Sequence, residues 1–326
     1  MSTARVGIAR AHSSPLARPQ RFLVTLCLAA AQSAFAAQPR PVQDDSGATL
    51  TLPAPAKRIV SLAPHLTEQL FAVGAGAQVI GVTAYSDFPE AARQLPQVGD
   101  SAQLDLERIV ALRPDLIVAW RSGNSVQQLD RLAALRIPIY RSESRELADI
   151  ASTLRRLGAL TGHADHAERE ARRFEAGVAA LRERYAARAE LRVFYQIWPQ
   201  PLLTINRTHM ISQALALCGA HNLFADLNAF TPTVGEEGVL GADPDAIVTG
   251  RAPGQRGDDL ERWRKLRGLR AAVLGNLIEV NADTLHRQSL RLIEGATELC
   301  EKLDAARERL RAAPPAHAAP EVKRPG

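Results

Sequence analysis

The sequence is poor in aromatic residues and cysteine, and it lacks the short motifs that mark the common enzyme classes. Three Trp, four Tyr, eight Phe and three Cys occur among its 326 residues. There is no P-loop, GxSxG elbow or HExxH motif, and Gly74-Ala75-Gly76 lacks the third glycine of a dinucleotide-binding loop. Without CxxC or HxxxH spacing, a zinc site is not expected. We therefore expect a protein that is not an enzyme and requires neither a cofactor nor a metal.

An excess of charge of one sign is confined to the N-terminus. Four of the 40 basic residues and none of the 35 acidic residues fall in residues 1–36, so the rest of the chain is nearly neutral. Binding to duplex nucleic acid needs a concentrated basic face. The sequence therefore argues against a nucleic-acid partner.

Residues 1–36 have the three parts of a secretory signal peptide. An Arg-rich start is followed by the apolar run 22–31 and by Ala34-Phe35-Ala36, a small-x-small cleavage signal. The apolar run is shorter than the roughly 20 residues of a membrane-spanning helix. Cys27 lies inside this run and not at the cleavage position of a lipoprotein. We expect an exported, soluble periplasmic protein.

Cys218 and Cys300 are the cysteines that remain after this cleavage. Each lies in an apolar stretch with a helical pattern, 211–218 and 290–303. An even number of cysteines in an oxidising compartment favours a disulfide between them. Two buried free thiols are the alternative, because unpaired cysteine is among the most buried residue types.

Apolar β-rich runs alternate with amphipathic helical patterns along most of the chain. Strands are predicted at 58–62, 78–82, 115–120, 137–140, 191–197, 246–249 and 277–280. Helices are predicted at 67–73, 106–112, 126–135, 146–160 and from 287 to about 311. This alternation is typical of an α/β fold in which helices cover both faces of a parallel sheet.

One segment of different character divides the α/β pattern. Residues 163–190 are rich in Ala, Glu and Arg, contain one glycine and no proline, and predict one helix about 40 Å long. The predicted organisation is a signal peptide (1–36), an N-terminal lobe (37–162), a linking helix (163–190), a C-terminal lobe (191–311) and a disordered Pro- and Ala-rich tail (312–326).

The second half of the chain echoes the first. The segment from Glu107 to Val118 matches the segment from Glu237 to Val248 at Glu, Pro, Asp, Ile and Val, with an offset of 130 residues. Segment 58–64 matches 192–199 more loosely and in the same order. Two matches in register predict two similar Rossmann-like lobes, joined by the long helix, with a ligand cleft between them.

The loops that follow the predicted strands should form the site, because open α/β sheets bind ligands at the carboxyl ends of their strands. Four of the chain's few aromatic residues fall in these loops. They are Tyr85, Trp120, Trp198 and Phe230. Such a lining suits a large, flat, partly apolar ligand.

Several of these segments resemble one family. Segments 58–68, 85–87, 106–121 and 123–124 are similar to the periplasmic vitamin B12-binding proteins that feed corrinoid ABC importers. That family belongs to the class III substrate-binding proteins, whose lobes are joined by a helical backbone. The resemblance covers essentially the whole chain after the leader and implies capture of vitamin B12 or cobinamide for a membrane permease. We expect the protein to be a monomer.

The resemblance also implies roles for single residues. Its corrinoid contacts fall on Tyr85, Trp120 and one loop, consisting of Asp283, Thr284, Leu285, His286 and Arg287. The permease would be docked through Glu107 and Glu237. Ala102, Ile197 and Thr231 stand where a family member has aromatic side chains. Trp198 and Phe230, adjacent to the last two, are expected to compensate.

Plainer interpretations remain open. Trp120 is compatible with ordinary core packing, and Glu107 and Glu237 with solvated helix starts favoured by the helix dipole. His65 is a candidate axial ligand to cobalt or iron, but capping of a helix that begins near Thr67 is the simpler role. The alternative functions are a haem or ferric-siderophore carrier on the same scaffold, a zinc or manganese carrier, and an unrecognised periplasmic hydrolase.

Overall fold

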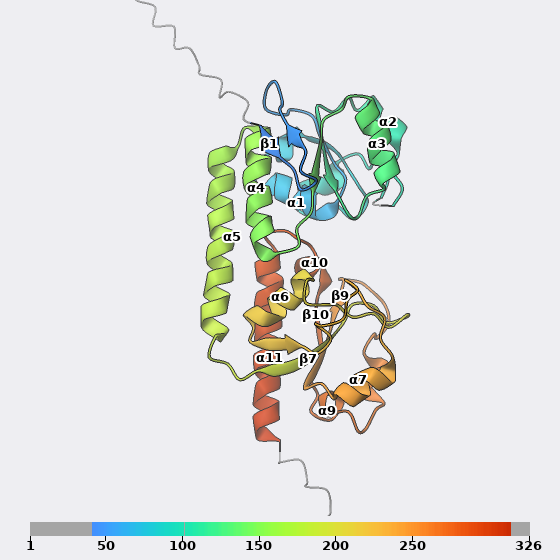
Figure 1. The fold of residues 1–326 in the computed structure, drawn as a ribbon, viewed down its shortest axis with the longest axis vertical. Helices are drawn as coiled ribbons and strands as arrows, with labels where there is room; N and C mark the ends of the chain where they lie inside the picture. The colour runs from blue at the N-terminus through green and yellow to red at the C-terminus, as the bar shows by residue number, and fades with distance from the viewer. Residues whose placement is uncertain (1–40, 101, 314–326) are drawn as a thin grey trace, which may run out of the picture. The chain divides into compact units, whose positions relative to one another are not determined.

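The computed structural model describes residues 41–100 and 102–313, which all belong to one compact unit. The predicted signal peptide and most of the predicted tail lie outside the described residues. Two four-stranded parallel sheets form the centre of the described part (Figure 1). We call the elements from β1 to α4 the N-terminal lobe and those from β7 to α11 the C-terminal lobe. The predicted α/β fold class is confirmed.

The sheet of the N-terminal lobe has the strand order β4-β3-β5-β6, with all strands parallel. Its strands are β3 (Ile59–Ser61), β4 (Val79–Val82), β5 (Leu116–Trp120) and β6 (Ile139–Ser142). Short 3₁₀ turns occupy Gly76–Gln78 and Glu90–Gln94. An antiparallel pair, β1 (Val42–Gln43) and β2 (Thr49–Leu50), precedes the sheet, and the sequence pattern does not predict it.

The sheet of the C-terminal lobe has the order β10-β9-β7-β8 and is also parallel. Its strands are β7 (Leu191–Gln196), β8 (Ala220–Asn222), β9 (Ala246–Arg251) and β10 (Leu277–Asn281). When the strands of each lobe are numbered in chain order, both sheets run 2-1-3-4. The two lobes therefore share one topology, as the sequence echo predicts. Strand β8 was not predicted because its three residues, Ala-His-Asn, do not form an apolar β-rich run.

The echoed Pro-Asp pairs form the same contact in both lobes. The carboxylate of Asp115 accepts a hydrogen bond of 2.9 Å from the backbone N–H of Arg58, at the start of β3. In the C-terminal lobe, Asp245 accepts one of 2.9 Å from the backbone N–H of Arg192 in β7. Each aspartate thus ties the third strand of its sheet to the first.

Apolar side chains cover both faces of the two sheets. In β5, Leu116 and Val118 pack on one face, and Ile117 and Ala119 pack on the other. One face of both sheets is covered by α1 (Pro64–Ala72), α4 (Leu147–Thr161), α5 (Ala164–Tyr185), α6 (Met210–Leu217) and α11 (Leu292–Ala312). The opposite faces are covered by α2 (Leu106–Ala111) and α3 (Val126–Ala134), and by α7 (Glu236–Ala242), α8 (Glu261–Arg264) and α9 (Arg270–Val273).

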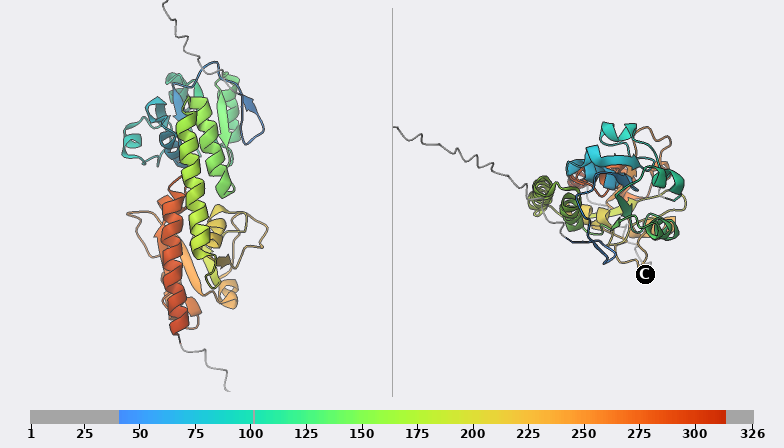
Figure 2. Two further views of the ribbon diagram at one scale, coloured as in Figure 1. Left: turned by 90° about the vertical axis from the view of Figure 1, so that its left-hand side faces the viewer. Right: turned by 90° about the horizontal axis from the view of Figure 1, so that it is seen from above.

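The linking helix is α5, which packs along α4 and then contacts α6 and α11 (Figure 2). Its one glycine, Gly177, lies where Ile293 of α11 approaches, 3.2 Å from the position of an added Cβ. The helix ends at Tyr185 and not at Glu190 as predicted, because the chain turns there and the Ala189 carbonyl accepts a hydrogen bond from Arg307. Within the described residues, no helix has the length and apolar character needed to cross a membrane.

Two helix starts differ from the prediction. Helix α1 begins at Pro64 because proline fits the first helical turn, whose N–H groups lack partners within the helix. His65 therefore lies inside α1, and the predicted cap is wrong. The last helix, α11, begins at Leu292 and not at Arg287. Between a short helix, α10 (Ala282–Leu285), and α11, the chain leaves the helical path to contact the N-terminal lobe.

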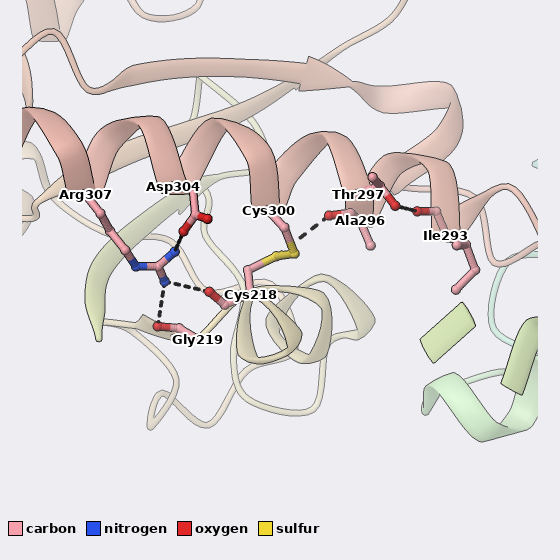
Figure 3. The surroundings of a disulfide bond; sticks show 8 residues. All are labelled: Cys218, Gly219, Ile293, Ala296, Thr297, Cys300, Asp304 and Arg307. Carbon is pink, nitrogen blue, oxygen red and sulfur yellow. Dashed lines mark hydrogen bonds and ion pairs between the residues drawn. A yellow bond between two sulfur atoms is a disulfide. The ribbon is translucent and has the colours of Figure 1, made fainter. Parts of the chain in front are cut away.

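The predicted disulfide between Cys218 and Cys300 is present and joins the end of α6 to α11 (Figure 3). Next to it, the Arg307 side chain donates hydrogen bonds to the carbonyl oxygens of Cys218, at 2.6 Å, and Gly219, at 3.0 Å. Asp304 forms an ion pair with Arg307 at 2.7 Å. The covalent bond and these contacts fix α11 against the sheet of the C-terminal lobe.

Candidate functional site

The carboxyl ends of the strands in the N-terminal lobe lead into three segments that carry the predicted site residues. Strand β3 leads into α1, β4 into the loop with Tyr85, and β5 ends at Trp120. The Tyr85 side chain is 77% exposed, and its backbone φ of 65° lies in the left-handed region. A tyrosine that is so exposed in a chain with few aromatic residues is available to a ligand.

Trp120 packs against the core and is also partly exposed. Its ring meets His65 edge-on, with the centroids 5.3 Å apart. An added Cβ at Gly123 would overlap this ring, so the loop can fold over the indole only with glycine at that position. Asn124 holds the loop by accepting a hydrogen bond from the Trp120 N–H, at 2.7 Å, and donating one to the Leu62 carbonyl, at 3.0 Å. Trp120 thus packs on the core, and its partly exposed edge leaves the predicted ligand contact open to it.

The corresponding edge of the C-terminal lobe carries two exposed aromatic side chains. Trp198 follows β7 and is 57% exposed, and its Nε1–H donates to the Gln200 carbonyl at 3.0 Å. Phe230 is 50% exposed and stacks against His209, with the ring centroids 4.7 Å apart. Both aromatics thus present apolar surface at the end of the sheet where ligands bind in open α/β folds.

The predicted loop 283–287 is helical at its start, and its residues have different surroundings. Asp283 is partly exposed, whereas Thr284 and Leu285 are buried, and Leu285 belongs to the hydrophobic core beneath α11. His286 is partly exposed and its Nε2 lies 2.7 Å from the buried hydroxyl of Tyr195. Leu285 therefore does not offer its side chain to a ligand.

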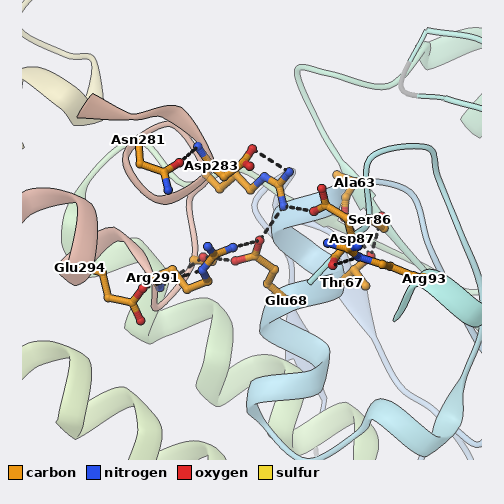
Figure 4. Close-up of polar contacts among 12 residues, drawn as sticks. Ala63, Thr67, Glu68, Ser86, Asp87, Arg93, Asn281, Asp283, Arg291 and Glu294 are labelled. Atoms are coloured by element: carbon orange, nitrogen blue, oxygen red, sulfur yellow. Dashed lines mark hydrogen bonds and ion pairs between the residues drawn. The ribbon is translucent and has the colours of Figure 1, made fainter. Parts of the chain in front are cut away.

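Figure 4 shows three carboxylates at the junction of the lobes, Glu68, Asp87 and Asp283. Arg287 contacts all three, and two of them, Glu68 and Asp87, belong to the N-terminal lobe. One of its nitrogens, Nη1, lies 2.9 Å from Glu68 of α1 and 2.6 Å from Asp87 in the loop after β4. The other, Nη2, lies 3.0 Å from Asp283. The Ser289 hydroxyl donates a hydrogen bond of 2.5 Å to Glu68. We call Glu68, Asp87, Asp283, Arg287 and Ser289 the interlobe cluster.

Two further contacts extend this junction. Arg291 approaches Glu68 at 3.4 Å, and its guanidinium lies 4.1 Å from the centroid of the Phe88 ring. The Gln69 side chain donates a hydrogen bond of 2.5 Å to the Gln288 carbonyl. The chain between α10 and α11 is therefore fastened to α1 and to the loop after β4.

The charges in the cluster shift one another's pKa values. Burial raises the pKa of Glu68, against the hydrogen bonds from Ser289 and Arg287. Burial would also raise the pKa of Asp87, but the hydrogen bond and charge of Arg287 outweigh it, and the pKa falls below its usual value. The pKa of Arg287 is raised, because Asp87 and Glu68 outweigh the effect of burial. Burial, and secondarily the charge of Arg287, lowers the pKa of His65 to about 3, so His65 is neutral.

The sequence did not reveal the interlobe cluster as a unit. Arg287 was predicted from the resemblance, but Glu68 and Ser289 were assigned no role. Glu68 and Arg287 are 219 residues apart, and no pattern in the sequence pairs them. The sequence offers one signal for such a contact. Glu68 is an acidic residue on the buried side of α1, and a buried carboxylate needs a partner.

Glu107 and Glu237 occupy equivalent places in the two lobes. Each is the second residue of its helix, α2 or α7, and both side chains are exposed. Asp105 caps α2 by accepting a hydrogen bond of 2.9 Å from the Arg108 N–H, whereas Gly235 precedes α7. The equivalence predicted from the sequence therefore holds in space for the two helices that carry the glutamates.

Two lobes of one topology, a helical connector and exposed aromatic residues at the strand ends define a two-lobed α/β binding protein. The family model for periplasmic binding proteins matches residues 59–284. The chain belongs to the periplasmic binding protein family, which implies a periplasmic location.

Curated relatives and solved structures show which binding proteins within this family the chain resembles. The chain is 40% identical to a vitamin B12-binding protein of Pectobacterium carotovorum over 251 residues, 76% of this chain and 89% of that protein. It is 38% identical to one of Yersinia pestis over 255 residues, 78% of this chain and 89% of that protein. The periplasmic vitamin B12-binding protein of Vibrio cholerae has a similar structure, with a TM-score of 0.71, 33% identity and coverage of 78% of this chain and 99% of that chain.

A haem-binding protein shares the scaffold as well. The periplasmic haem-binding protein of Pseudomonas aeruginosa superposes with a TM-score of 0.64 and 26% identity, covering 80% of this chain and 95% of that one. The proteins that these comparisons name are binding proteins and not enzymes.

Proposed function

We propose that this protein captures a corrinoid, vitamin B12 or cobinamide, and delivers it to an ABC importer. The observation that carries the proposal is the 40% identity to a vitamin B12-binding protein across three quarters of the chain. The likeness to the Vibrio cholerae structure, at 33% identity, supports it. Ligand capture and release require no chemical change in the corrinoid, so the proposed role is not enzymatic.

The proposed ligand contacts are the side chains exposed at the strand ends of both lobes. Tyr85, Trp198 and Phe230 supply apolar surface, and the partly exposed edge of Trp120 adds to it. Flat aromatic side chains suit stacking against a corrin ring. Asp283 and His286 supply polar groups beside them, whereas the buried side chains of Thr284 and Leu285 anchor α10 to the protein interior.

Arg287 supports a corrinoid over haem as the ligand. Haem carries two carboxylates, which binding sites usually meet with arginine or lysine. Arg287 already contacts Glu68, Asp87 and Asp283, so its charge is compensated before any ligand arrives. The amide side chains of a corrinoid are neutral and do not need a free cation. Haem remains the second candidate because of the Pseudomonas aeruginosa relative.

One purification and one titration series test the proposal. We expect the protein, exported with its native leader, to co-purify with a ligand whose visible spectrum and mass are those of a corrinoid. The ligand-free protein should bind cyanocobalamin or dicyanocobinamide one-to-one in isothermal titration. Tight binding of haemin without binding of either corrinoid would favour haem. Turnover of the bound corrinoid would contradict a purely carrying role.

The remaining features of the proposal concern export and partners. We propose that residues 1–36 are removed on export, and that the chain divides into lobes at 37–162 and 191–311 with the linking segment 163–190 between them. The protein would act as a monomer and dock onto a membrane permease through Glu107 and Glu237. Their equivalent, exposed positions on α2 and α7 support that docking role.

A further inference from the structure

His209 is a histidine of the C-terminal lobe whose ring orientation is fixed on one side. It is the N-cap of α6, and its Nδ1 accepts a hydrogen bond of 3.2 Å from the backbone N–H of Ile211. A neutral imidazole that accepts at Nδ1 carries its proton on Nε2. In the described part of the chain, Nε2 has no hydrogen-bond partner, and the ring is partly exposed.

The ring of His286 is fixed through its other nitrogen, Nε2. Its Nε2 lies 2.7 Å from the hydroxyl of Tyr195, a fully buried side chain with no other hydrogen-bond partner among the described residues. A buried hydroxyl proton without an acceptor costs free energy, so Tyr195 donates to Nε2. The proton of the neutral His286 ring is then on Nδ1. Gly250 permits this placement, because an added Cβ there would overlap the His286 ring.

Each histidine lies next to a part of the proposed ligand site. Phe230 stacks on His209 with the ring centroids 4.7 Å apart, and His286 directly follows α10 in the predicted loop 283–287. Burial lowers the pKa of His209 to about 4, with His286 as the smaller cause, and burial lowers that of His286 to about 4. Both rings are therefore neutral at the pH of the periplasm.

We propose that His209 and His286 present two ring N–H groups, Nε2–H and Nδ1–H, to carbonyl oxygens of the amide side chains of the bound ligand. This inference rests on the proposed corrinoid function and adds His209 to the binding site. Neutral donors match neutral amide carbonyls without burying an uncompensated charge. Tyr195 acts as a positioning residue, because it selects the His286 tautomer and does not itself contact the ligand.

Substitution of His209 by asparagine gives the sharpest test. Asparagine is a favoured N-cap residue, so it can still accept from the Ile211 N–H, but its side chain is too short to place a donor where Nε2 lies. We expect His209→Asn to weaken binding of dicyanocobinamide about fivefold to tenfold in isothermal titration, with an unchanged melting temperature. His209→Ser, which also caps the helix, should weaken binding to a similar degree.

The matched control is His221→Asn, because His221 is an exposed histidine of β8 in the same lobe, and its substitution should leave binding unchanged. Tyr195→Phe should raise the dissociation constant by a smaller factor and alter the ¹⁵N chemical shifts that report the His286 tautomer. If both His209 variants fold and bind dicyanocobinamide within twofold of the wild type, the proposal is overturned. A wild-type protein that binds no corrinoid would instead overturn the proposed function, which is a distinguishable result.

Discussion

Arg287 of the C-terminal lobe lies 2.9 Å from Glu68 of the N-terminal lobe, and the side chains are only 14% and 3% exposed. This ion pair is shielded from solvent, and Ser289 and Arg291 also contact the same carboxylate. It therefore joins the lobes at the edge of the sheets where the ligand is proposed to bind.

We expect Glu68→Gln to lower the free energy of unfolding by about 2–3 kcal/mol, because it removes the less exposed of the two carboxylates through which the opposite lobe contacts Arg287. Urea unfolding would measure the change. Glu90→Gln is the control, since Glu90 pairs with Arg93 on the surface, where both side chains are mostly exposed. That substitution should cost about 0.5 kcal/mol or less. Equal losses in the two variants would argue against a special role for the interlobe cluster.

The two lobes should change their relative position little when ligand binds. Besides the interlobe cluster, the Gln213 side chain of α6 accepts from the Leu147 N–H, at 3.1 Å, and donates to the Arg145 carbonyl, at 2.9 Å. These contacts and the continuous helix α5 oppose a wide hinge motion. X-ray scattering profiles recorded with and without cyanocobalamin should nearly coincide. A large compaction on binding would contradict this expectation.

Stability should fall as the pH is lowered below neutrality. The pKa values of His209 and His286 are about 4 and that of His65 is about 3, all below the value of 6.5 for an unperturbed histidine. The unfolded chain therefore binds these protons first, and stability is lost as the pH falls from about 6.5 toward the folded pKa values. Each histidine should contribute about 1–2 kcal/mol of loss at pH 5.

One variant tests how much of this pH dependence of stability comes from His65. The His65 ring contacts Trp120 and has no hydrogen-bond partner among the described residues, so His65→Gln removes the titrating group with little other change. Urea unfolding at pH 7 and pH 5 should show a smaller loss in this variant than in the wild type. An identical pH dependence would show that His65 does not contribute.

Gly123→Ala should weaken corrinoid binding about tenfold although Gly123 is not itself a proposed contact, because the added Cβ would displace the Trp120 ring. Trp120→Ala should weaken binding by roughly 1–3 kcal/mol through lost contact area. The double variant should bind no more weakly than Trp120→Ala alone, since both changes act through one ring. Gly238→Ala, on α7, is the control because nothing lies within 4 Å of its added Cβ. If the losses of binding free energy in the two single variants add up in the double variant, Gly123 does not act through the Trp120 ring.

Reversal of both docking glutamates, Glu107→Arg with Glu237→Arg, should leave corrinoid affinity unchanged and abolish stimulation of uptake in reconstituted vesicles. Both residues are exposed on equivalent helices, so arginine at either place should not disturb the fold. Single reversals should have milder effects, and high salt should weaken docking of the wild type because exposed charges are screened. Normal uptake by the double variant would show that both glutamates are only solvated residues at helix starts and do not dock the permease.

Much of the architecture was predictable because it depends on local patterns. Strand β5 is a continuous apolar run, and β7 and β9 each contain three consecutive apolar residues, as expected for parallel strands buried on both faces. The echo between segments 107–118 and 237–248 corresponds to a repeated helix, turn and strand, since the same Pro-Asp pair makes the same backbone contact in each lobe. The position of the exposed aromatic residues was predictable because the loops after parallel strands form the binding edge of an open α/β sheet.

Only the tertiary structure shows which side chains that are far apart in the sequence contact one another. Glu68 and Arg287 are 219 residues apart, and Tyr195 and His286 are 91 apart, so no local pattern links either pair. The start of α11 moved to Leu292 because the preceding residues are held by contacts with the N-terminal lobe, which a helical pattern cannot express. The sequence by itself determined two similar α/β lobes with parallel strands, and it indicated the edge where the ligand is proposed to bind. Packing determined the pairing of Arg287 with Glu68, the burial of Leu285 and the tautomers of the two histidines, because each depends on partners that only the folded chain brings together.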